Sequence, residues 1–286
     1  YQTYMGIKKD YGKWDDISEA REAEDLQLAK DNLAKVKMID VAKLDPQTAL
    51  SHKLMVQQLE DQIADYKWRY HNYPVNQMFG LHSMVPSMLI NQHQVGDVSD
   101  AEAYISRINN VVPLLKELEK GLNKRADKGI MAPQFVYPYV ISDSENLLNG
   151  APFNGEGDST VLADFKRKVE KLDIAQADKD QLINRANEAL LNAFKPAYES
   201  LVATLKVLES KADTRDGAWK FPDGEAFYNN ALKNTTTTDM TAHEIHEIGL
   251  AEVARIHGEM REIMKKVEFK GDLKAFFEFM RNDKQF

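Results

Sequence analysis

Apolar residues recur at intervals of three and four in the first part of the chain, which is the spacing of an amphipathic helix. One such segment lies within residues 15–40. Asp45 and Pro46 then supply a helix N-cap and a proline at the first helical position, and the apolar spacing resumes to about Tyr70. Pro74 pushes its preceding residue out of the helical region. The pattern predicts two helices, paired as an antiparallel hairpin that ends near Pro74.

The next segments carry further helix signals. Met78–Ile90 is weakly polar and shorter than the roughly 20 residues of a membrane span, so it indicates a buried core helix. Ser99 and Glu102 have the spacing of a capping box, which predicts a helix to about Lys128. Gly129 is placed to end that helix with a left-handed cap.

The second half of the chain begins with a loop. Pro133 opens a predicted helix to Leu148, and the run 149–159 then concentrates Gly, Pro, Asn and Ser, as a domain boundary or a surface excursion does. Residues 178–181 form another capping-box pattern, followed by a long helix that Pro196 is expected to kink. The predicted core positions of that helix are Leu182, Leu190, Leu191, Phe194, Tyr198, Leu201, Leu205 and Leu208.

These patterns predict an all-α fold, a multi-helix array of long antiparallel helices with at most a short strand or hairpin. No repeat with a fixed period supports a solenoid. With 286 residues, 43% of them hydrophobic, the chain can bury a substantial core. Residues 1–286 are therefore treated as one helical portion, with a subdivision into 1–150 and 158–286 at the Gly/Pro/Asn-rich loop as the alternative.

Charge and composition exclude several classes of function. The chain has 37 basic and 45 acidic residues and a net charge of -8, which argues against nucleic acid or an anionic membrane as a partner. No segment predicts a membrane span. The absence of cysteine excludes disulfides and thiolate chemistry, and it fits a cytoplasmic location and an oxidising compartment equally well.

The densest motif region lies between Gly217 and Ile256. It contains a G-x-W-x-x-P-x-G-x-x-x-Y block, a Thr-Thr-Asp turn and an I-H-x-x-G-L-x-E-V pattern. Upstream lie the run GIMAPQFVYPYVI at residues 129–141 and, before it, the segment DAEAYISRINNVVPLL. These motifs resemble a large bacterial family catalogued as domain of unknown function eight-eighty-five, and the resemblance covers most of the chain.

Members of that family typically continue to an H-E-x-x-G-H element, which marks them as zinc metallopeptidase-like proteins. Such chemistry needs two imidazoles one helical turn apart and a carboxylate that activates the metal-bound water. Residues 1–286 contain no His-Glu-x-x-His pattern. The resemblance therefore implies that this chain is the N-terminal helical portion of a larger hydrolase, without catalytic residues or cofactor of its own and with zinc expected only in the parent protein.

The same resemblance implies partners and a location. The partners are the remainder of the same polypeptide, as a C-terminal catalytic portion, and a peptide substrate. Many members look like lipoproteins, which implies a periplasmic or envelope-anchored protein. Tyr1 stands where a start methionine would, so a removed upstream segment is expected.

The block from Gly217 to Tyr228 has two interpretations. Its Pro-Asp-Gly turn and aromatic residues predict a rigid turn that leads into a short helix, which is typical of a packing corner. The resemblance instead suggests that Trp219 or Tyr228 faces a substrate cleft, with the Tyr hydroxyl available to a developing oxyanion. The β-branched run Thr235–Thr238 after it predicts an extended segment or turn.

One cluster has metal-ligand spacing. His243, His246 and Glu247 lie three and four residues apart on one predicted helix, which is a spacing that can hold a divalent ion. Thr241 and Glu244 form a capping box at the start of that helix, so the local acidic residue also has a purely structural explanation. We therefore predict no metal in this chain and keep His243, His246 and Glu247 as the alternative site.

Two functions remain compatible with the sequence: the non-catalytic portion of a peptidase-like hydrolase, and a self-contained helical protein- or peptide-binding or scaffold lipoprotein domain without enzymatic activity. An apolar stripe near the end of the chain should distinguish them. Its members are Leu273, Phe276, Phe277, Phe279 and Met280. Exposure of the stripe would indicate a domain interface, and burial would indicate a finished module.

Overall fold

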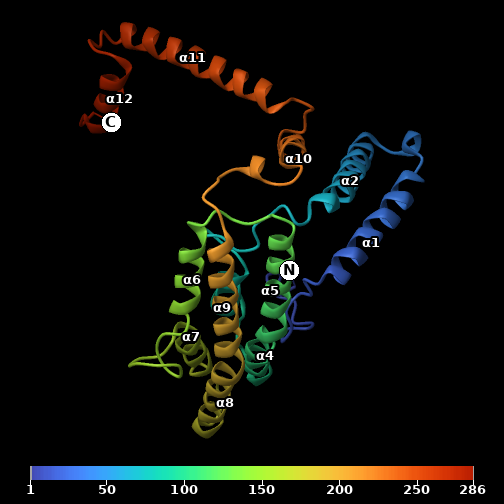
Figure 1. The fold of residues 1–286 in the computed structure, drawn as a ribbon, viewed down its shortest axis with the longest axis vertical. Coiled ribbons are helices and arrows are strands. Elements are labelled where there is room, and N and C mark those ends of the chain that lie inside the picture. Colours follow the sequence, from blue (N-terminus) through green and yellow to red (C-terminus); the bar gives the residue numbers. More distant parts are fainter. Residues whose placement is uncertain (1, 286) are drawn as a thin grey trace. The chain divides into compact units, whose positions relative to one another are not determined.

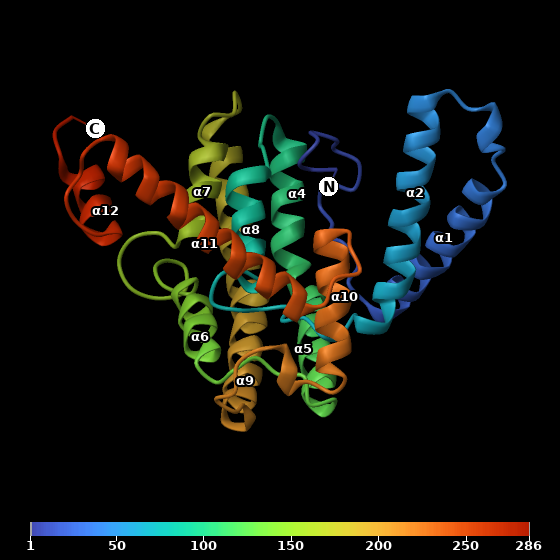
Figure 2. The same ribbon diagram turned by 90° about the horizontal axis from the view of Figure 1, so that it is seen from above.

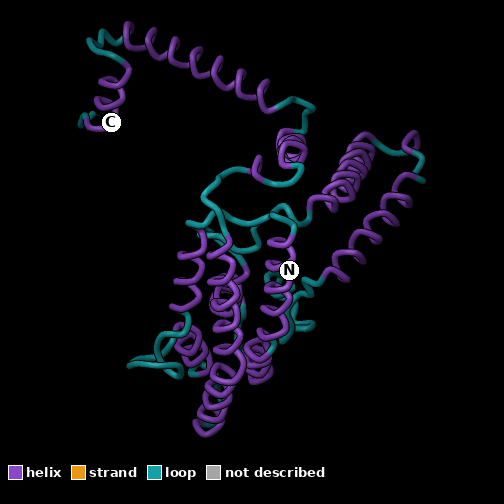
Figure 3. Tube along the Cα trace, in the orientation of Figure 1, coloured by secondary structure: helices purple, strands orange, loops and turns teal. Residues whose placement is uncertain are grey.

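The computed structural model describes residues 2–285, which form helices joined by loops and no strand within that range (Figure 3). The predicted all-α class is confirmed. The chain divides into two compact units, Tyr1–Gly224 and Glu225–Phe286, called here the N-terminal and C-terminal units. The division falls at Gly224, and the loop at residues 149–159 lies inside the N-terminal unit.

The N-terminal unit begins with the predicted hairpin. Helices α1 (Glu19–Lys37) and α2 (Pro46–Asp65) run side by side and in opposite directions (Figure 1, Figure 2). Asp45 caps α2 as expected, because its carboxylate accepts the backbone N–H groups of Gln47 and Thr48 at 3.0 and 3.1 Å.

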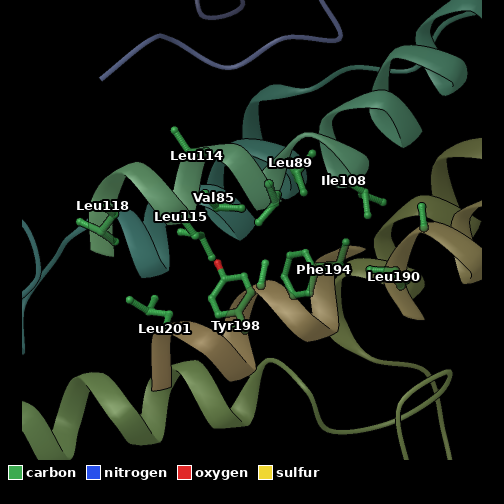
Figure 4. Close-up of a cluster of buried hydrophobic side chains, with 14 of the residues drawn as sticks. Val85, Leu89, Ile108, Leu114, Leu115, Leu118, Leu190, Phe194, Tyr198 and Leu201 are labelled. Carbon is green, nitrogen blue, oxygen red and sulfur yellow. The ribbon is translucent and has the colours of Figure 1, made fainter. Parts of the chain in front are cut away.

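The rest of the N-terminal unit is a bundle around one apolar core. Its main helices are α3 (Leu81–Ser87), α4 (Val98–Asn109), α5 (Val111–Asp127), α6 (Val136–Asn146), α7 (Thr160–Val169), α8 (Gln176–Ala189) and α9 (Lys195–Lys211). Helix α9 packs between α5 and α6, while α8 contacts α4 and α7 (Figure 2). Tyr198 of α9 and Phe194, directly before α9, are fully buried and face Leu115 of α5 (Figure 4). The Tyr198 hydroxyl donates to the His82 carbonyl oxygen at 2.7 Å, so the buried hydroxyl group is satisfied.

Two predictions about α4 are wrong. The cap is Asp97 rather than Ser99, because the Asp97 carboxylate accepts the Asp100 N–H at 3.0 Å and also the Ser99 hydroxyl at 2.6 Å. The helix does not continue to Lys128 but ends at Asn109, and α5 starts at Val111. Pro113 explains the break, since proline has no N–H to donate and its ring clashes with the carbonyl four residues earlier.

Other helix boundaries follow the sequence more closely. Gly129 ends α5 with φ of 73°, and the Ile130 N–H reaches back to the Arg125 carbonyl at 2.9 Å, as the predicted left-handed cap requires. Helix α6 starts at Val136, a few residues after Pro133. The cap expected at residues 178–181 is wrong, because α8 already begins at Gln176, without a side-chain cap.

The bundle contains two π turns: Met88–Gln92 ends α3, and Leu190–Phe194 lies between α8 and α9. The second ends two residues before Pro196, the position at which the sequence predicts a kink in the long helix. It also leaves Leu191, a predicted core position, exposed. At the first turn, the buried Lys168 ammonium donates to the Leu89 and Ile90 carbonyls at 2.8 and 2.9 Å.

The segment before α1 is fastened to α4 by a buried guanidinium. Arg107 donates to the Lys13 carbonyl at 3.1 Å, to the Thr3 hydroxyl at 2.5 Å and to His93 Nδ1 at 3.0 Å. His93 Nε2 donates to the Asp100 carbonyl at 2.9 Å. Because Nδ1 accepts from a cation, the ring is neutral, and burial lowers the pKa of His93 to about 4.

The C-terminal unit consists of α10 (Gly224–Thr236, which begins at the division), α11 (Ala242–Lys266) and α12 (Leu273–Asn282). The extended segment expected at Thr235–Thr238 is wrong for its first half, because Thr236 is still helical and its hydroxyl donates to the Leu232 carbonyl at 2.9 Å. The predicted capping box at the start of α11 is confirmed. Helix α12 packs against α11. None of the helices within residues 2–285 has the length and hydropathy needed to cross a bilayer.

Candidate functional site

Three segments that are distant in sequence meet in the N-terminal unit. The Gln134 N–H donates to the Asp213 carbonyl at 2.8 Å, and His71 Nε2 donates to the Pro222 carbonyl at 2.9 Å. The Phe221 ring lies edge-on to the Tyr73 ring, with 5.7 Å between centroids. The segments 71–73, 129–141 and 213–224 therefore form one structure, which we call the aromatic corner.

Glycines fix the path of the chain through this corner. Gly217 has φ of 80°, in the left-handed region that favours glycine. A Cβ atom on Gly224 would stand 2.1 Å from the Ala218 carbonyl oxygen, so no other residue fits there. Between them lies a 3-10 turn, Ala218–Lys220. The rigid turn that the Pro-Asp-Gly sequence predicts is thus present, and sterics explain both glycines of the motif.

The two aromatic residues of the turn face different environments. Phe221 is only 7% exposed and packs in the corner, whereas Trp219 is 69% exposed. Between them, the Lys220 side chain is buried and its ammonium lies 3.3 Å from the Asp213 carboxylate. The packing-corner interpretation therefore accounts for Phe221, while the Trp219 indole remains available to a ligand or partner.

A small apolar cavity lies under the corner, lined by Tyr73, Leu122, Ile130 and Tyr137 among others. Its volume of about 20 Å³ holds no more than a water molecule. Burial raises the pKa of both Tyr73 and Tyr137 to about 12, so both phenols are protonated at neutral pH. A peptide would have to bind to the outer surface of the corner rather than in this cavity.

The remaining sequence-predicted site residues lie in the C-terminal unit. Tyr228 is 49% exposed on α10. His243, His246 and Glu247 are all exposed on the first turns of α11. Across residues 2–285, the structure brings together no group of three His, Cys, Asp or Glu side chains that could hold a metal ion.

Glu244, next to these residues, has a local partner. Its carboxylate accepts the Thr241 N–H at 2.8 Å, and the Glu244 N–H donates to the Thr241 hydroxyl at 3.3 Å. The backbone hydrogen bond from Thr241 lowers the pKa of Glu244. Its role is that of a helix cap, as the structural interpretation of the sequence predicts.

Comparison with known proteins places the chain in a family. All of residues 1–286 match the family described as bacterial protein of unknown function, DUF885. The chain belongs to DUF885. No curated protein matches it significantly.

The crystal structure of a "putative lipoprotein" from Colwellia psychrerythraea has a similar fold, with a TM-score of 0.81 and 21% sequence identity. The match covers 100% of this DUF885 chain and 51% of the other one, so the chain spans about half the length of that solved relative. At this identity the likeness concerns the fold alone.

The apolar stripe near the end of this DUF885 chain is largely covered. Phe276 is buried, and its ring packs against Phe269 at 5.1 Å. The other four members of the stripe are half-buried. In the C-terminal unit, exposed apolar side chains lie instead on α11 and its C-cap, at Ile248, Leu250, Val253, Ile256, Ile263 and Val267. The sequence-based predictions do not include this surface, although the apolar spacing within residues 245–267 is visible in the sequence.

Proposed function

We propose that this DUF885 chain is the non-catalytic, N-terminal helical portion of a zinc metallopeptidase-like hydrolase that acts on peptides, and that it forms one wall of the substrate cleft. The observation that carries the proposal is the exposed Trp219 indole, held on a turn whose backbone is fixed by two glycines. The half-length match to a solved relative supports the placement of zinc and catalysis on further polypeptide.

The chemistry of an exposed indole suits this role. Its flat apolar face stacks against apolar side chains, and its N–H can donate to a peptide carbonyl. Because the turn is already rigid, binding does not have to order it, which reduces the entropic cost of association. On α10, the half-exposed Tyr228 offers a hydroxyl donor of the kind that stabilises a developing oxyanion.

The alternative is a self-contained helical protein- or peptide-binding or scaffold domain without enzymatic activity. The coverage of the α12 stripe, with Phe276 buried, favours this interpretation. The open apolar surface of α11 opposes it, because a finished module normally covers the apolar face of a long helix.

We also propose an envelope location, as a periplasmic or lipid-anchored protein. The support is the description of the solved relative as a lipoprotein, which is a statement about that protein.

The first test is to read the encoding gene beyond the codon for Phe286 and to assay the full-length product with peptide substrates, with and without a zinc chelator. We expect a His-Glu-x-x-Gly-His or His-Glu-x-x-His element and chelator-sensitive hydrolysis.

Trp219→Ala should raise KM at least several-fold and leave the melting temperature unchanged, whereas Tyr4→Ala, which also removes an exposed aromatic ring, should change neither. Full activity of Trp219→Ala would show that Trp219 does not contact the substrate. A stop codon after Phe286 would contradict the hydrolase proposal and favour the self-contained binding domain.

Tyr228 and the alternative metal site have separate tests. Tyr228→Phe in the full-length protein should lower kcat without a change in stability, and unchanged turnover would exclude the hydroxyl from the reaction.

The 286-residue chain alone should bind no stoichiometric zinc by elemental analysis. Zinc that is present and is lost in His246→Ala would instead establish a site at His243, His246 and Glu247.

A further inference from the structure

Helix α11 carries a continuous apolar line along one face. The residues that form it are Ile245, Gly249, Val253, Ile256, Met260, Ile263 and Val267, which we call the α11 seam. At 100° per residue they fall within an arc of about 80°, along a helix about 37 Å long. All seven are exposed or half-buried, and within α11 only Met264 is buried.

Charged residues on the polar side of α11 form ion pairs with one another. Arg255 reaches the Glu252 carboxylate at 2.8 Å and the Glu259 carboxylate at 2.6 Å, one helical turn to either side. The seam has no comparable partner in the described part of the C-terminal unit, since Val253 is 51% exposed and Val267 58%. An amphipathic helix gains its stability from covering its apolar face, so this face is built for contact with something else.

Gly249 lies at the middle of the seam's arc, one helical turn after its first residue, Ile245. Apart from the neighbouring residues and the backbone of its own helix, no atom lies within 4 Å of the position that a Cβ would take there, and the backbone is helical, so neither crowding nor φ requires glycine. Glycine within a helix lowers stability by about 1 kcal/mol relative to alanine, and it permits close approach of a second backbone. Gly258 is equally open but lies on the opposite face, and therefore serves as a control.

We propose that the α11 seam is the docking surface for a helix from the additional polypeptide of a full-length DUF885 protein, which crosses α11 closest at Gly249. The chain spans 51% of the solved relative of the same fold, so a protein of that length has about as much polypeptide again to cover the seam. A membrane surface is the weaker candidate, because interfacial helices carry Lys and Arg in excess, whereas α11 carries five Glu and four Lys or Arg residues. The proposal shares with the proposed function the existence of a longer chain, but it does not depend on peptidase activity.

The test is hydrogen exchange of the α11 amides in the 286-residue chain and in the full-length product of the gene. We expect at least tenfold slower exchange across residues 249–263 in the full-length protein. In the 286-residue chain, Gly249→Ala and Gly258→Ala should both slow exchange by roughly three- to fivefold, because each raises helix propensity equally. In the full-length protein only Gly249→Ala should lose protection, since its methyl group lies in the docked surface.

Three outcomes would overturn the proposal: equal α11 exchange in the two proteins, identical behaviour of both alanine variants in the full-length protein, or a gene that stops at Phe286. Protection of α11 in the 286-residue chain that grows with concentration would identify a second copy as the occupant instead. Protection of α11 in a full-length protein that shows no chelator-sensitive hydrolysis would refute the peptidase proposal and still support docking at the α11 seam.

Discussion

The two compact units bury their apolar residues to very different extents. The N-terminal unit has a core with completely buried aromatic side chains, among them Tyr104, Phe165, Phe194 and Tyr198. In the described part of the C-terminal unit, the buried hydrophobic residues are Met264 and Phe276. Similar amphipathic helices are thus stabilised by a shared core in one region and by local interactions in the other. Substitutions should therefore have different effects in the two units.

The largest contrast should come from truncating one apolar side chain in each unit. Phe194→Ala removes a fully buried ring and should lower the free energy of unfolding of the N-terminal unit by about 3–5 kcal/mol. Ile256→Ala on the α11 seam, in the 286-residue chain, should change stability by less than about 0.5 kcal/mol. Chemical denaturation followed by tryptophan fluorescence and circular dichroism measures both. Equal losses would mean that α11 is packed as tightly as the bundle around Phe194.

The second largest difference should be the loss of stability at acidic pH, which we expect in the N-terminal unit because it contains the buried His93. The pKa of His93 is about 4 in the folded protein and near 6.5 in the unfolded chain, so the unfolded chain takes up a proton between these values that the folded protein does not. The contribution of His93 to the stability of the N-terminal unit should thus be fully present above pH 6.5. The free energy of unfolding should fall by up to about 3 kcal/mol as the pH drops towards 4.

The measurement is the free energy of unfolding between pH 7 and pH 4.5, for the native chain and two variants. His93→Gln should flatten this part of the profile, in addition to a loss of stability at all pH values. His243→Gln, which replaces an exposed ring in the C-terminal unit, should keep the slope of the native chain. A profile that is unchanged in His93→Gln would show that other groups control the acid response.

The smallest effect concerns helix caps. Thr241→Ala breaks the capping box of α11 and should destabilise that helix by about 1 kcal/mol, which corresponds to roughly fivefold faster amide exchange. Asp97→Ala removes the matching cap of α4, whose amides should still exchange through unfolding of the whole N-terminal unit. If amide exchange in α4 alone also became about fivefold faster in Asp97→Ala, α4 would unfold locally as α11 does, and the proposed difference between the units would be wrong.

Local chemistry made much of the fold predictable. Asp45, Gly129 and Thr241 act where the sequence indicates, because capping depends on a few neighbouring residues. The wrong boundaries come from competition between signals. Asp97 displaced Ser99 as a cap, and Pro113 divided a helix that its apolar spacing would have continued.

The candidate site was predictable only in part. The sequence indicates a rigid turn around Trp219, but whether Trp219 or Phe221 faces inward depends on His71 and Tyr73, which come from a distant segment. Likewise, the spacing on α11 predicts an amphipathic helix and does not reveal whether its apolar face is covered. Periodicity specifies which residues share a face, whereas coverage depends on the rest of the structure.

The π turn at Leu190–Phe194 has a consequence for changes in chain length. A π turn corresponds to one residue inserted into an α-helix, and deletion of that residue would rotate α9 by about 100° relative to α8. Tyr198 and Leu201 would then leave the core. Homologous chains should consequently vary in length at the exposed loop near residues 154–157, while gaps should be rare between Leu190 and Phe194.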